Sequence, residues 1–89
     1  MTRSVYDTMI NAPRTSVALG SFHLLSTAQD FRTPGIRLAS ATSLALLLCE
    51  HYKVDPQDAF TVANNLMNDH DDRGLTDFEA IRLYMKEEM

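Results

Sequence analysis

The sequence predicts an all-α fold, a small single-domain bundle of about four helices with a short N-terminal helical arm. Three helix-start signals support this prediction, namely Thr33-Pro34, Asp55-Pro56 and the segment Thr76–Glu79. Proline is favoured at the first helical position because the missing amide hydrogen would be unpaired there anyway. Threonine and aspartate side chains accept hydrogen bonds from the free amides of a first turn. At 89 residues the chain has room for one domain.

Residues 1–15 are predicted to form the arm, and residues 16–89 the helical domain. In the arm, Ser4 followed by Asp7 predicts the start of a short helix that ends before Pro13. A second helix is predicted over residues 16–31 because apolar side chains recur there at helical spacing; they are Val17, Leu24, Ala28 and Phe31, joined by Ala18, Phe22 and Leu25. A strand over residues 14–20 is the competing interpretation.

The third helix is predicted to run from Pro34 to Lys53 and to be the central one. Every residue from Leu44 to Cys49 is apolar, so this helix is expected to be buried on most of its sides. Cys49 is the only cysteine and cannot form an internal disulfide. We therefore expect Cys49 to fill space in the core.

Two further helices follow. The first is capped by Asp55 and should stop before Gly74, with an apolar stripe along one face formed by Ala59, Phe60, Ala63, Leu66 and Met67. The last is predicted to start at Thr76, because Thr76 and Glu79 have the spacing of a capping box. Its apolar face is expected to contain Phe78, Ile81 and Met85.

The net charge of −4 is unevenly distributed. Residues 1–53 contain five basic and three acidic side chains, whereas residues 54–89 contain three basic and nine acidic ones. No secretory segment is visible, and the longest apolar run, Leu44–Cys49, is far shorter than the roughly 20 residues that span a bilayer. We therefore expect a cytoplasmic protein that makes no membrane contact.

Catalysis and cofactor binding are not expected. Only three glycines occur, and none belongs to a phosphate-binding loop or flanks a nucleophilic serine. His51 and Cys49 are two residues apart, which places them on different sides of a helix and argues against a shared metal ion. We therefore expect no enzyme activity, no cofactor and no metal.

One segment resembles the calcium loop of the helix–loop–helix hand. In residues 69–80, Asp69, Asp71, Gly74 and Asp77 fit positions 1, 3, 6 and 9 of that loop. The segment departs from the pattern at position 5, where Arg73 stands, and at position 12, where Ala80 replaces the bidentate glutamate. A degenerate calcium-binding loop is therefore a third functional hypothesis, and an acidic solvated turn is its structural alternative.

A second resemblance is to the helix-turn-helix of DNA-binding regulators, because residues 44–67 could form two helices joined at Val54-Asp55. The second of these helices has no lysine or arginine to hold phosphates. DNA binding is the alternative hypothesis, and we expect nucleic acid to be a poor partner.

Binding to another protein is the function that the sequence favours. The apolar central helix, the five methionines and the charge asymmetry all fit an interaction surface. We expect the acidic residues of the C-terminal third to contact a basic patch on the partner; they are Asp69, Asp71, Asp72, Asp77 and Glu79. Small acidic helical chains include phage-encoded inhibitors of host enzymes, so inhibition of a host protein is one form of this function, and a homo-oligomer is also open.

Overall fold

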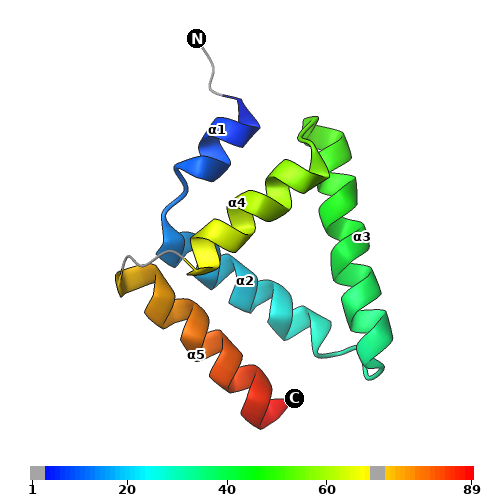
Figure 1. The fold of residues 1–89 in the computed structure, drawn as a ribbon. Helices are drawn as coiled ribbons and strands as arrows, with labels where there is room; N and C mark the ends of the chain where they lie inside the picture. The colour runs from blue at the N-terminus through cyan, green and yellow to red at the C-terminus, as the bar shows by residue number, and fades with distance from the viewer. Residues whose placement is uncertain (1–3, 69–71) are drawn as a thin grey trace.

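The structure is a computed structural model that describes residues 4–68 and 72–89, except for the side chains of residues 72–76. Over this part of the chain it has five helices and no strand, which confirms the all-α fold (Figure 1). The helices are α1 (Val5–Ile10), α2 (Arg14–Ala28), α3 (Pro34–Tyr52), α4 (Pro56–Asn68) and α5 (Asp72–Glu88). The competing strand over residues 14–20 is wrong, because α2 begins at Arg14 and contains all of that segment.

Two of the predicted helix starts use the expected capping residue. The Ser4 hydroxyl accepts a hydrogen bond from the Asp7 amide at 3.1 Å. The Asp55 carboxylate accepts from the amides of Gln57 and Asp58 at 2.8 and 3.3 Å. Within the described range 4–68, α3 begins at Pro34 as predicted, but the Thr33 side chain makes no capping hydrogen bond.

Removing the cap of α4 should weaken the fold measurably. We expect Asp55→Ala to lower the free energy of unfolding by about 1 kcal/mol, because two amides of the first turn lose their acceptor. Urea denaturation followed by circular dichroism measures this change. Asp55→Asn is the matched control, since its amide oxygen can still cap; a loss as large as that of the alanine variant would contradict the capping role.

The predicted start of the last helix at Thr76 is wrong, since α5 already begins at Asp72 and runs through Gly74 and Thr76. The earlier start still places an acidic residue at the positive end of the helix dipole. The Glu79 side chain pairs with Arg82, one turn along the helix, and thus does not point back toward a cap. A start signal of only four residues is easily overridden when a longer helix gains contacts with the rest of the fold.

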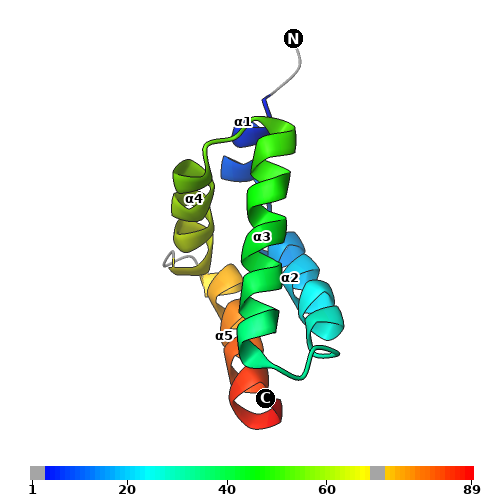
Figure 2. The same ribbon diagram turned by 90° about the vertical axis from the view of Figure 1, so that its right-hand side faces the viewer.

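The best-packed part of the molecule is the contact between α2 and α5, which run side by side in the same direction (Figures 1 and 2). Ala18 is 3% exposed and Phe78 4% exposed. The rings of Phe22 and Tyr84 meet edge to face with centroids 5.2 Å apart. The Tyr84 hydroxyl also donates to the Gln29 side-chain oxygen at 3.0 Å, which ties α5 to the end of α2.

Helix α4 packs on this pair, and α1 lies against α4. Val62 is the buried residue of α4, although the predicted stripe did not include it. Of the predicted stripe, Phe60 is 51% exposed. The Arg82 guanidinium donates to the Asn68 side-chain oxygen at 3.5 Å and links the end of α4 to α5.

The expectation that the central helix is buried on most sides is wrong. In α3, all of whose residues are described, only Cys49 is buried, as the sequence predicted for that residue. Leu38, Leu44 and Leu47 are 71%, 44% and 61% exposed. The reason is the path of the chain: α3 diverges from α2 beyond its first turn and approaches α4 near its last, so its middle lies against no other helix (Figure 1).

Candidate functional site

The most unusual feature of the described structure is the exposed apolar surface of α3. Two sides of the helix contribute to it. The outer ridge consists of Ile36, Leu46 and Leu47, which are 54%, 46% and 61% exposed. The groove stripe lies roughly on the opposite side of the helix and consists of Leu38, Ala41, Leu44, Ala45 and Leu48. We call the outer ridge and the groove stripe together the α3 surface.

The groove stripe faces α2 across an apolar groove, which we call the α2–α3 groove. It consists of two hollows of about 550 and 440 Å³ that adjoin because both are lined by Leu24, Ala28 and Ala41. At one end the groove is bordered by Met85 and Met89 of the C-terminal segment. Methionine side chains adapt their shape to an incoming apolar group, so this end suits a variable contact.

Arg37 helps to hold α3 at this angle to α2. Its guanidinium donates to the backbone carbonyl of Phe31 and, at 3.5 Å, to that of Gln29. Both carbonyls belong to the turn between the two helices. The turn is therefore braced, and the groove is a defined feature of the fold.

A third apolar hollow of about 350 Å³ lies on the α4 side of α3. Its wall includes Val5 and Met9 of α1, Leu48 and Tyr52 of α3, and Phe60 of α4. The apolar lining of α3 thus extends from the α2 side to the α4 side.

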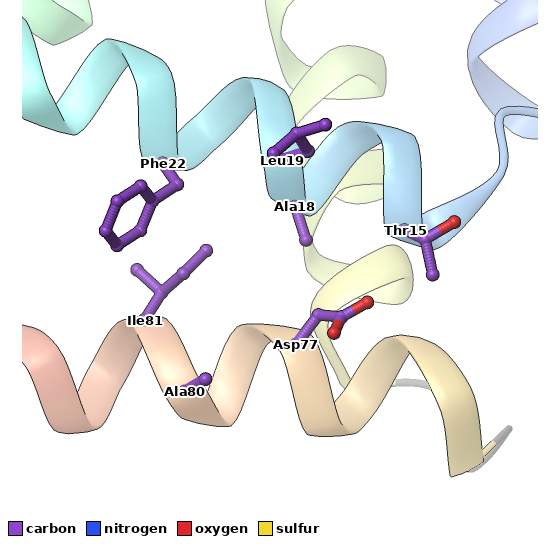
Figure 3. A pocket seen from close by; sticks show the side chains of 7 residues that line it. All are labelled: Thr15, Ala18, Leu19, Phe22, Asp77, Ala80 and Ile81. Carbon is purple, nitrogen blue, oxygen red and sulfur yellow. The ribbon is translucent and has the colours of Figure 1, made fainter.

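The predicted acidic site is only partly described. Asp69 and Asp71 lie outside the described residues, as does the side chain of Asp72. Asp77 is half-buried and faces α2, whereas Glu79 is exposed and pairs with Arg82 (Figure 3 for Asp77). Because residues two apart on a helix point in different directions, the described members do not form one face.

Asp77 borders a hollow of about 360 Å³ between α2 and α5. Figure 3 shows its carboxylate directed toward α2, on the side where Thr15 lies, with Ala18, Phe22 and Ile81 along the walls. Asp77 is the only ionisable side chain among the described residues that line this hollow. The described lining of this hollow therefore offers no pair of titrating groups for acid–base chemistry.

The calcium-loop hypothesis stays a prediction, because Asp69 and Asp71, its ligands at positions 1 and 3, lie outside the described residues. Residues 72–80 belong to α5, so most of the proposed loop is helical. Successive side chains on a helix rotate by about 100°, so a helical backbone over these residues differs from the loop that a calcium-binding hand uses.

The helix-turn-helix hypothesis has a partial structural counterpart. Helices α3 and α4 are joined by a tight turn in which Lys53 adopts a left-handed conformation with φ of 58°. The Val54 amide closes the end of α3 by donating to the Cys49 carbonyl at 2.9 Å. However, Asp58 is the one charged residue of α4, so this helix offers phosphates no cation.

Sequence reasoning missed several exposed residues of the α2–α3 groove. Leu24 belongs to the apolar set that predicts α2 but is 62% exposed, whereas its neighbour Leu25 in the same set is 8% exposed. A signal was present, because apolar residues occur on more than one side of α2, as they do on α3. Neither helix therefore has a stripe that identifies its buried face.

None of the described helices has both the length and the apolar character needed to cross a membrane. Comparisons of this chain with known protein families, with curated proteins and with solved structures find no match.

Proposed function

We propose that this chain is a small non-catalytic regulator that acts by binding another protein. The observation that carries this proposal is the exposed α3 surface, on which large apolar side chains follow each other along a 19-residue helix. Monomeric proteins rarely expose contiguous apolar patches of more than a few hundred Å², and larger patches mark interaction sites.

The outer ridge of α3 suits a protein partner. Ile36, Leu46 and Leu47 stand on one side of a regular helix, which is how a helix presents anchors to the apolar groove of another protein. Their burial would supply most of the affinity, since a few central apolar anchors dominate most interfaces.

The uneven charge of the chain supports a partner with a basic surface. Residues 54–89 contain nine acidic and three basic side chains, and the field of such a segment accelerates encounter with a positive patch. We propose that the partner carries basic residues beside its apolar groove and that binding takes place in the cytoplasm. Inhibition of a host protein by a phage-encoded chain is one biological setting that fits this chemistry.

The outer ridge can be tested with a matched pair of variants used as bait in the native cell extract. Leu47→Lys places a charge on the ridge, whereas Leu83→Lys changes a similarly exposed leucine on α5, 55% exposed, that lines none of the three hollows beside α3. We expect wild type and Leu83→Lys to retain one stoichiometric protein partner and Leu47→Lys to lose it. Retention of the same proteins by all three baits would overturn the proposal.

Raising the salt concentration provides the second arm of this test. If the acidic segment steers the encounter, the association rate should fall as salt rises from 50 to 500 mM, on the order of tenfold, while dissociation changes little. Surface plasmon resonance with the recovered partner measures both rates. A rate that is independent of salt would contradict the role of the acidic segment.

A further inference from the structure

The single chain leaves more surface exposed than a folded monomer of its size normally does. Its accessible surface is 7006 Å², whereas a monomer of 10.0 kDa is expected to expose roughly 5,200 Å². Its radius of gyration is 13.8 Å, against about 12 Å for a typical domain of this length. The excess of about 1,800 Å² is the surface that a partner would cover if the assembled chain reached ordinary burial.

We propose that this partner is a second copy of the chain, and that two copies pair with the groove stripe of each α3 against the α2–α3 groove of the other. Stable dimers bury about 800 Å² per chain, and obligate dimers bury more than 1,000 Å². The excess surface is of this size. Pairing would thus give each chain the burial that an ordinary folded domain of its length reaches alone.

Self-complementarity favours a second copy over an unrelated protein at this groove. Each chain supplies both an apolar groove and an apolar helix of 19 residues. In a dimer with a twofold axis, the helix of each copy can therefore pack against the groove of the other. The groove and the apolar helix are parts of the same chain, so a second copy can cover both without an unrelated partner. Pairing also accounts for the part of the run Leu44–Cys49 that lies on the groove stripe, namely Leu44, Ala45 and Leu48.

Charge does not oppose this pairing. Arg37 and Glu50 are the two fully charged side chains of α3, so the helix is close to neutral. Arg37 lines both hollows of the groove, and its guanidinium donates to the carbonyls of Phe31 and Gln29. The acidic residues that would attract a basic partner lie in the segment 54–89, and not on α3. The pairing shares with the proposed function only the premise that α3 is an interface, and it uses the side of α3 opposite the outer ridge.

Size exclusion with light scattering on the purified chain tests the pairing. At tens of micromolar we expect wild type to have about twice the monomer mass of 10.0 kDa. Leu44→Lys and Leu38→Lys place a charge on the groove stripe and should give the monomer mass, with dissociation constants raised at least tenfold. Leu83→Lys on α5 is the control and should leave the dimer intact.

Three results would overturn the pairing. They are a wild-type protein that is monomeric at every concentration, an assembly larger than a dimer, and groove variants that dimerise like wild type. Leu38→Lys is included because loss of the dimer in this variant is not explained by misfolding. A side chain that is 71% exposed adds little to the stability of a single chain. Loss of helix in this variant while Leu83→Lys stays folded would support the pairing, since it would show that Leu38 is covered in the native protein.

The two proposals fail separately. A monomeric wild-type chain that still loses its protein partner on Leu47→Lys would overturn the pairing and leave the proposed function standing. A dimer that is sensitive to Leu44→Lys, together with baits that all retain the same proteins, would overturn the proposed function and leave the pairing standing.

Discussion

Replacing Phe78 with alanine is expected to lower the free energy of unfolding by about 3–5 kcal/mol. Phe78 is 4% exposed in the best-packed part of the molecule, and its ring also borders a hollow beside Val17, Leu66 and Met67. Its removal would leave a cavity where α2, α4 and α5 meet. Because small domains are often only about 5 kcal/mol more stable than their unfolded state, much of the population should unfold at 37 °C.

Urea denaturation followed by circular dichroism measures this loss, and Phe60→Ala is the matched control. Phe60 is 51% exposed, so the same truncation should cost about 1 kcal/mol or less. Equal losses at the two positions would show that the buried contact of α5 is not the main source of stability.

The second large effect is expected at Leu25. Leu25 is 8% exposed, and Leu25→Ala should lower the free energy of unfolding by about 2–3 kcal/mol. Leu24→Ala makes the same chemical change at the next residue, which is 62% exposed, and should cost less than about 0.5 kcal/mol in the single chain. Thermal unfolding of both variants below one micromolar measures the difference.

Repeating the measurement at high protein concentration makes this pair of leucines informative about assembly. Leu24 lines both hollows of the α2–α3 groove and is 62% exposed, so a second copy seated there would bury it, whereas Leu25 borders one hollow and is already buried. The Leu24→Ala variant should then lose a larger part of its concentration-dependent stabilisation than Leu25→Ala does. A melting temperature of wild type that does not change over a hundredfold range of concentration would contradict this expectation.

The candidate site was foreseen only in part. From the sequence, the apolar central helix was expected to be mostly buried and also to fit an interaction surface; α3 is in fact largely exposed, and its role as an interface stays a proposal. The acidic set stays a prediction, since Asp77 faces α2, Glu79 pairs with Arg82, and the other three side chains lie outside the described part of the chain. Acidic residues that are close together in the sequence need not share one face of a helix, because neighbouring side chains on a helix point in different directions.

By itself, the sequence determined the helical class and most of the helix boundaries of this protein. The bonds at Ser4 and Asp55 span at most three residues, so the local sequence contains everything needed to predict them. The start at Pro34 is equally local, because the proline ring restricts the backbone of its own residue.

Only the tertiary structure decided which faces of these helices are buried. Leu24 and Leu25 are both leucines on α2, yet one is exposed and the other buried, because α5 lies against one side of α2 and not the other. The earlier start of α5 and the exposure of α3 also depend on contacts between residues far apart in the chain. Apolar patterning identifies a buried face when a helix has one apolar side; where the residues are apolar on several sides, the available neighbours decide.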